Sequence, residues 1–170
     1  MRLFIAINFD EHCKAEMIEV QDRLRSLGRG RFSTPENLHL TLAFLGEIPE
    51  SRVDDIKAAM DSVDVPGQTL VFERVGCFRR DSELWWIGLK KTPALMKLHK
   101  DLSEALTAYG FSLEKRAFKP HITLAREMHI GRTDSKDLLP VPFDTRVDAM
   151  SLMLSHRPNG KLTYTELYRR

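Results

Sequence analysis

The spacing of apolar residues predicts alternating strands and helices from the start of the chain. The apolar run over 3–8 is typical of a buried strand, and apolar positions within 10–28 recur at intervals of three and four, as on one face of a helix. Asp10 is a suitable cap for that helix, and Gly28 is expected to end it in the left-handed conformation. A strand over 38–44 follows, so the first part of the chain predicts a strand–helix–strand unit.

The same kind of pattern continues to the end of the chain. The next predicted elements are a short helix opened by a Ser51–Asp54 capping box and ended by Pro66, strands over 68–77 and 83–90, a helix from the Thr92–Pro93 cap to Gly110, and a strand over 120–126. Residues 127–145 are expected to form a long loop, a kind of segment that often carries function. Two last strands, over 146–156 and 161–168, should meet at the turn Pro158-Asn159-Gly160.

These predicted elements repeat along the chain. The pattern His-aliphatic-Thr-Leu-Ala stands at 39–43 and again at 121–125, an interval of 82 residues (39 to 121). The same interval aligns residues 3–45 with 85–127 without a gap, strand on strand and helix on helix. Because a fixed-period repeat changes the expected fold, the sequence predicts a duplicated strand–helix–strand unit within one two-lobed domain spanning 1–170.

Composition and charge set broad limits. Hydrophobic residues make up 42% and charged residues 29% of the chain, enough to bury a core of useful size. The net charge of +2 permits an anionic ligand without requiring one. Cys13 and Cys77 stand in no metal-binding or redox spacing, which favours a reducing compartment. The apolar start is too short for a signal peptide or a membrane span, so a cytoplasmic location is expected.

The polar face of each repeated strand carries the candidate chemistry. Strict alternation places His39, Thr41 and Ala43 on one face and Leu42 and Phe44 on the other. A face of His, Thr and Ala is poorly suited to a core, so we expect it to line a cleft. The duplication then predicts that the equivalent face of the second unit lies opposite, across a pseudo-twofold axis.

Two opposed histidines suit a phosphoester displacement. One imidazole, of His39 or His121, can deprotonate a nucleophile while the other protonates the leaving oxygen. The hydroxyls of Thr41 and Thr123 can orient the non-bridging oxygens. A single strand histidine is more often structural than catalytic, but two identical motifs at matching positions of a repeat favour function.

Two stretches resemble the signatures of a known family. Residues 35–47 (PENLHLTLAFLGE) are similar to the first signature of the two-histidine phosphoesterases, and residues 118–126 (FKPHITLAR) to the second. More narrowly, they resemble the RNA 2′,3′-cyclic phosphodiesterases, also called 2′-5′ RNA ligases. The opening strand over 2–7 and the closing hairpin over 154–164 are also similar, so the likeness covers nearly the whole chain.

The resemblance implies a bilobed α+β fold of two antiparallel sheets that face each other across a central cleft, with helices on their outer faces. It implies no metal ion and no cofactor. The implied reaction is hydrolysis of a 2′,3′-cyclic phosphate to a 2′-phosphomonoester, with reversible 2′-5′ ligation left open. The implied partners are RNA 3′ ends or nucleotides with such a phosphate, and a monomer without membrane contact or an obligate protein partner is expected.

The resemblance also assigns roles to individual residues. His39 would be the proton donor and His121 the proton acceptor, although the residues alone do not assign these roles because the two motifs are nearly symmetric. Phe44 and Arg126 would border the nucleobase. Strict alternation, however, places both on the face opposite their histidine. Either each strand bulges or ends before them, or Phe44 is a core residue and Arg126 a surface charge.

Other interpretations remain open at this level. The chain could be a catalytically silent module that binds RNA or nucleotides, or a metallophosphatase, although neither signature strand supplies the carboxylates that a metal site needs. Trp85-Trp86 could stack on bases, but the repeat makes a buried strand the better prediction. The basic loop residues that could follow an RNA backbone are Arg29, Arg31, Arg79, Arg80, Lys115, Arg116 and Lys119.

Overall fold

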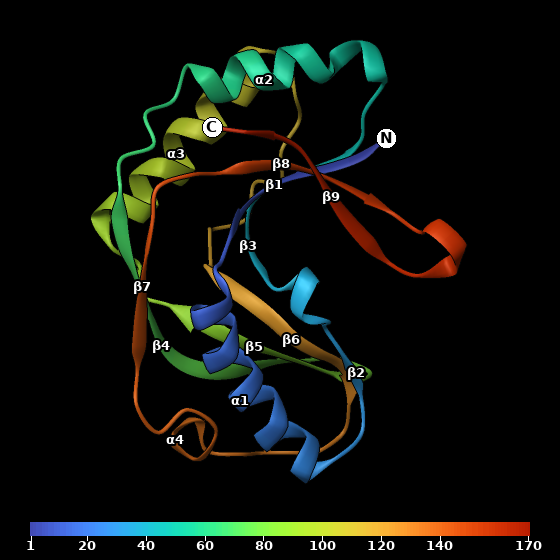
Figure 1. Ribbon diagram of the computed structural model, residues 1–170, viewed down its shortest axis with the longest axis vertical. Coiled ribbons are helices and arrows are strands. Elements are labelled where there is room, and N and C mark those ends of the chain that lie inside the picture. Colours follow the sequence, from blue (N-terminus) through green and yellow to red (C-terminus); the bar gives the residue numbers. More distant parts are fainter.

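Two antiparallel sheets organise the protein, whose computed structural model describes residues 1–170 (Figure 1). Sheet A contains, in spatial order, β3 (His39–Glu47), β1 (Arg2–Asn8), β8 (Ser151–His156) and β9 (Thr163–Arg169). Sheet B contains β2 (Arg31–Phe32), β6 (His121–Met128), β5 (Glu83–Leu89), β4 (Gln68–Arg79) and β7 (Phe143–Val147). The predicted α+β fold with two antiparallel sheets is confirmed.

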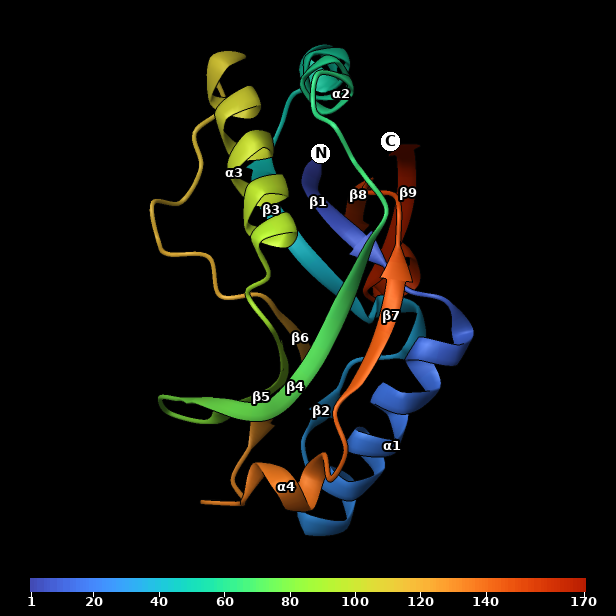
Figure 2. The ribbon, with the colours of Figure 1, turned by 90° about the vertical axis from the view of Figure 1, so that its left-hand side faces the viewer.

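The helices are exchanged between the sheets. The four helices are α1 (Glu11–Leu27), α2 (Val53–Asp61), α3 (Pro93–Ala108) and α4 (Ser135–Leu138). Helix α1 follows β1 of sheet A, yet it packs against β6 and β7 of sheet B. Helix α3 joins β5 to β6 of sheet B, yet it packs against α2 and β3 as well as against β4. Figure 2 shows α2 and α3 beside sheet A and α1 beside sheet B. One apolar cluster of 35 buried residues therefore draws on both sheets.

The two repeated units begin their helices in the same way. The carboxylate of Asp10 accepts a hydrogen bond from the Cys13 amide at 2.8 Å, and the hydroxyl of Thr92 accepts one from the Leu95 amide at 3.2 Å. Both predicted caps are confirmed, and they stand 82 residues apart (10 to 92). Each helix returns the chain to an antiparallel neighbour of the strand it left, β3 beside β1 and β6 beside β5.

Gly28 ends α1 as predicted, but its predicted left-handed conformation is wrong. It is extended, with φ 174°, and is needed for space instead: a Cβ there would lie 2.5 Å from Cγ2 of Ile130. Ser51 does not cap α2, because a 3₁₀ turn over Glu50–Arg52 already carries the chain into the helix. Gly110 adopts φ 88° just after α3, as expected for a left-handed residue at a helix end.

The last third of the chain departs most from the prediction. Residues 127–145 contain α4 and the start of β7 instead of a continuous loop. The predicted strand over 146–156 is interrupted at 148–150, where the chain leaves sheet B and enters sheet A. The predicted turn at Pro158–Gly160 does join β8 to β9. None of the helices combines the length and the apolar character needed to cross a membrane.

Candidate active site

A bulge in β3 decides which side chains face the cleft. Ile5 and Ala6 are consecutive in β1, but they pair with Ala43 and Thr41, so Leu42 is an extra residue in β3. Leu42 and Ala43 are both buried in the core, Phe44 then pairs with Phe4, and a second register shift follows at Leu45. The predicted position of Ala43 on the His39 face is therefore wrong, and Phe44 returns to that face.

Strand β6 has the same bulge 82 residues later. Trp85 and Trp86 pair with Ala125 and Thr123, so Leu124 is the extra residue. The buried side-chain amide of Gln21 donates to the Leu124 carbonyl at 3.0 Å, which the Ser33 amide also approaches at 2.9 Å. Helix α1 thus stabilises the bulge through Gln21. The bulge brings Arg126 to the same side of the sheet as His121.

One cleft of about 960 Å³ lies between the two sheets and contains every predicted site residue. His39, Thr41 and Phe44 line it from sheet A, and His121, Thr123 and Arg126 line it from sheet B. The bulges explain how Phe44 and Arg126 reach the cleft in spite of their offset of five residues from the histidines. Of the basic loop residues considered from the sequence, only Arg31 lines this cleft.

Both imidazoles are held in the same orientation by the main chain. Nδ1 of His39 lies 2.8 Å from the Asn37 carbonyl oxygen, and Nδ1 of His121 lies 2.6 Å from the Lys119 carbonyl oxygen. A carbonyl only accepts hydrogen bonds, so each Nδ1 carries a proton and each neutral ring has its lone pair on Nε2. The hydroxyl of Thr41 lies 2.9 Å from Nε2 of His39 and can donate to it.

The surroundings of His39 disfavour its charged form. The ring is half-buried between Phe4 and Tyr164, whose centroids lie 4.9 and 5.2 Å from its own. This burial is the main reason that the pKa of His39 is lowered to about 4, and repulsion from His121 and Arg126 acts in the same direction. His39 is therefore neutral at pH 7.

Phe44 is supported at the mouth of the cleft. The Arg2 guanidinium lies over the Phe44 ring, 4.9 Å from its centroid, and the ring remains 43% exposed. Such a cation–π contact stabilises an exposed ring in one orientation. Arg126 is exposed on the opposite strand, beside Arg31, which pairs with Glu127 at 3.4 Å.

Sequence reasoning missed several residues of the cleft. Phe4, Asn37 and Tyr164 line it close to His39. From the sequence, His156 could approach a ligand or be an exposed residue beside the turn; it lines the cleft, with its Nε2 2.8 Å from the Thr165 hydroxyl. Phe4 was detectable, because the repeat aligns it with Trp86 beside the second histidine. Tyr164 carries no such signal, since it reaches His39 only through the pairing of β9 in sheet A. No group of three or more His, Cys, Asp or Glu side chains is arranged to hold a metal ion.

Two opposed sheets that each present a His-x-Thr strand to a shared cleft define a protein of the two-histidine phosphoesterase class. The family model of the 2′-5′ RNA ligase superfamily matches residues 10–159. The chain therefore belongs to the 2′-5′ RNA ligase superfamily, as its two signatures indicated.

Individual relatives agree with this assignment. An RNA 2′,3′-cyclic phosphodiesterase of Thermotoga maritima is 36% identical, over 99% of this chain and 94% of that protein. A protein of the same name from Escherichia coli K12 is 30% identical, again over 99% and 94%. The crystal structure of E. coli LigT in apo form has a TM-score of 0.84 at 29% identity and covers 99% of this chain and 95% of that one. LigT complexed with 3′-AMP has a TM-score of 0.83.

Proposed function

We propose that this protein hydrolyses the 2′,3′-cyclic phosphate at an RNA 3′ end to a 2′-phosphomonoester, without a metal ion. The observation that carries the proposal is the pair of imidazoles, His39 and His121, on opposite walls of one cleft and in one fixed tautomer. The names of the relatives at 36% and 30% identity support the same reaction. Both sheets contribute to this site, so residues 1–170 would act as one catalytic unit.

His121 would be the general base. Its Nδ1 proton is engaged by the Lys119 carbonyl, and its Nε2 makes no hydrogen bond within the protein, so Nε2 is free to take a proton. In the proposed reaction a water molecule attacks phosphorus and loses its proton to Nε2 of His121. The bond between phosphorus and the 3′ oxygen breaks, and the phosphate remains on the 2′ oxygen.

His39 would be the general acid, which gives its proton to the departing 3′ oxygen. This role requires a protonated ring, whereas the pKa of His39 in the protein alone is only about 4. A bound phosphodiester anion would offset the repulsion from His121 and Arg126 and would raise this pKa. The hydroxyls of Thr41 and Thr123 would meanwhile donate to the non-bridging oxygens.

Inorganic phosphate should therefore raise the pKa of His39 from about 4 toward its ordinary value of 6.5. The measurement is an NMR titration of the histidine ring protons with and without phosphate, with the His39 signal assigned from the His39→Gln variant. A His39 titration that stays the same when phosphate is seen to bind would contradict the proposed role as acid.

The base would lie between Phe44 and Arg126 at the mouth of the cleft. Replacement Arg126→Ala should raise KM about tenfold and leave kcat nearly unchanged, since stacking on a base contributes roughly 1–3 kcal/mol. Steady-state kinetics would measure the effects of the substitution on KM and on kcat separately. The control is Arg116→Ala, which removes an exposed arginine paired with Glu114 outside the cleft. A loss confined to kcat would contradict a purely binding role.

The reaction itself is tested by the identity of its product. We expect the purified chain, with chelator present, to convert RNA ending in a 2′,3′-cyclic phosphate to the 2′-phosphomonoester, identified against synthetic 2′- and 3′-phosphate standards. A 3′-phosphate product, or activity that the chelator abolishes, would overturn the proposal. Binding without any product would instead favour a silent RNA- or nucleotide-binding module. One copy of the chain supplies both histidines, so no oligomer is needed for the site. We expect a monomer, which light scattering would test.

A further inference from the structure

A second aromatic surface lies beside His121, outside the residues that line the cleft. Phe78 of β4 meets the His121 imidazole edge to face, with ring centroids 5.5 Å apart, and packs on Trp86 of β5 at 5.3 Å. Trp86 is buried, whereas Phe78 is 39% exposed. A solvent-facing ring thus stands directly beside one of the two proposed proton-transfer groups.

The other lobe provides a comparison. Phe4, which the repeat aligns with Trp86, lies 4.9 Å from the His39 ring, and Tyr164 lies 5.2 Å from it. Both of these rings line the cleft, whereas Phe78 and Trp86 do not. Each histidine therefore has two aromatic neighbours. Phe4 and Trp86 are buried, Tyr164 is half-buried, and Phe78 is the most exposed of the four. An exposed phenylalanine by itself is common on protein surfaces. Phe78, however, is held in place by its contacts with Trp86 and His121, beside a proposed catalytic histidine, so its ring is a candidate for stacking on a nucleobase.

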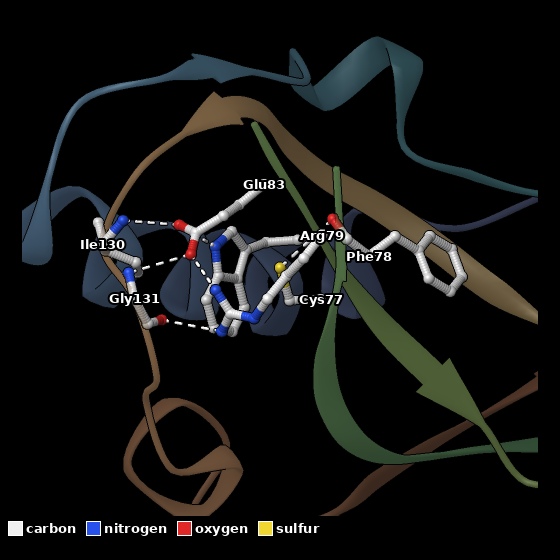
Figure 3. A network of polar contacts seen from close by, with 7 residues as sticks. Cys77, Phe78, Arg79, Glu83, Ile130 and Gly131 are labelled. Carbon is white, nitrogen blue, oxygen red and sulfur yellow. Dashed lines mark hydrogen bonds and ion pairs between the residues drawn. The ribbon is translucent and has the colours of Figure 1, made fainter. Parts of the chain in front are cut away.

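The hairpin that carries Phe78 is fixed on its opposite face. The buried carboxylate of Glu83 accepts hydrogen bonds from the amides of Ile130 at 2.6 Å and Gly131 at 3.0 Å, and it pairs with Arg79. Figure 3 shows Arg79 directed into this network and the ring of Phe78 pointing away from it. Because the hairpin is already ordered, stacking on Phe78 would immobilise few additional groups.

We propose that Phe78 is a stacking platform for the nucleobase that precedes the cyclic end, and that the preferred substrate is RNA of two or more nucleotides. This inference rests on the proposed function. A 2′,3′-cyclic phosphate engages both the 2′ and the 3′ oxygen, so the chain continues only through the 5′ oxygen. A second base beside His121 must therefore belong to the preceding nucleotide.

The charges around the platform suit a single-stranded RNA. The Arg74 guanidinium lies over the Trp86 ring, 4.9 Å from its centroid, and Arg74 is exposed. Lys119 is exposed two residues before His121. These cations can neutralise the phosphate that links the last two nucleotides, in the combination of aromatic stacking and basic side chains that single-strand binding uses.

Three substrates together measure how much stacking on Phe78 contributes to kcat/KM. They are the mononucleotide adenosine 2′,3′-cyclic phosphate, a dinucleotide ending in the same group, and that dinucleotide without its 5′ base. The wild-type chain should show a kcat/KM for the intact dinucleotide about tenfold above that for the abasic one, because stacking contributes roughly 1–3 kcal/mol per base. Phe78→Ala should lower the value for the intact dinucleotide about tenfold and leave the other two substrates unchanged, and Phe78→Trp should retain the preference.

The controls separate this inference from a structural effect. Tyr109→Ala removes another exposed ring, 41% accessible at the end of α3, and should leave all three values unchanged. Thermal unfolding should show that Phe78→Ala keeps the fold. An equal loss for the mononucleotide and the dinucleotide, or no loss for either, would overturn the platform.

A failure of the proposed function can be distinguished from a failure of the Phe78 inference. If the wild-type chain hydrolysed none of the three substrates, the platform would still be tested by fluorescence anisotropy with labelled dinucleotide products that carry a 2′-phosphate. Phe78→Ala should then weaken binding of the intact product about tenfold and leave the abasic product unaffected. Equal affinities of the variant and the wild type for the intact product would overturn the inference independently of catalysis.

Discussion

The variants His39→Ala and His121→Ala should each lose about 10²- to 10⁴-fold in kcat on a 2′,3′-cyclic phosphate, because each removes one of two proton transfers. The double variant should lose far less than the product of the two losses, since the imidazoles act as a unit on one displacement. The measurement is the rate of 2′-phosphomonoester formation at saturating substrate.

A matched control makes this result specific. His12 is exposed on α1 and does not line the cleft, so His12→Ala should retain wild-type kcat. Circular dichroism should show that all three single variants keep the fold. If either cleft variant, of His39 or His121, retained kcat within a few-fold of the wild type, the two-histidine mechanism would be wrong for this protein.

The stability of the protein should depend on His39 in mildly acidic solution. In the folded state the pKa of His39 is about 4, mainly through burial, whereas the ordinary value in an unfolded chain is 6.5. Between these two pH values the unfolded state binds more protons than the folded state, so the free energy of unfolding rises with pH. At about 1.4 kcal/mol per pKa unit, the contribution of His39 amounts to about 3 kcal/mol.

Urea unfolding of the wild type and of His39→Gln between pH 4 and 7.5 would measure this contribution. The carboxylates titrate in both proteins, so the difference between the two free energies isolates His39. This difference should grow in favour of the wild type by about 3 kcal/mol as the pH rises to 6.5 and should then level off. Parallel curves for the two proteins would contradict the buried, neutral state of His39.

Local sequence patterns were sufficient to predict the helices and strands of the repeated units. The caps Asp10 and Thr92, the apolar face of each helix and the following His-x-Thr strand are all encoded over short distances, and each lies where it was expected. These signals are local because a helix cap or a periodic face depends only on neighbouring residues. The 82-residue interval then indicated that the two units pair in the same way.

The alternation of side chains along a strand predicted the wrong face of the sheet where the pairing of the strand with its partner includes an extra residue. Phe44 and Arg126 reach the cleft because Leu42 and Leu124 are extra residues in their strands. A bulge depends on how a strand meets its partner, and in β6 it also depends on Gln21 from a helix that belongs to the other unit. The loop predicted over 127–145 was wrong for the same reason, because β7 forms only by pairing with β4.

By itself, the sequence determined the duplicated strand–helix–strand units, the two His-x-Thr strands and the family, since these reside in residue types at short, fixed intervals. Only the tertiary structure decided that the helices exchange sheets, that the bulges turn Phe44 and Arg126 into the cleft, and that Tyr164 and Phe78 flank different histidines. These features arise from contacts between residues far apart in the chain, and such contacts leave no periodic signal in the sequence.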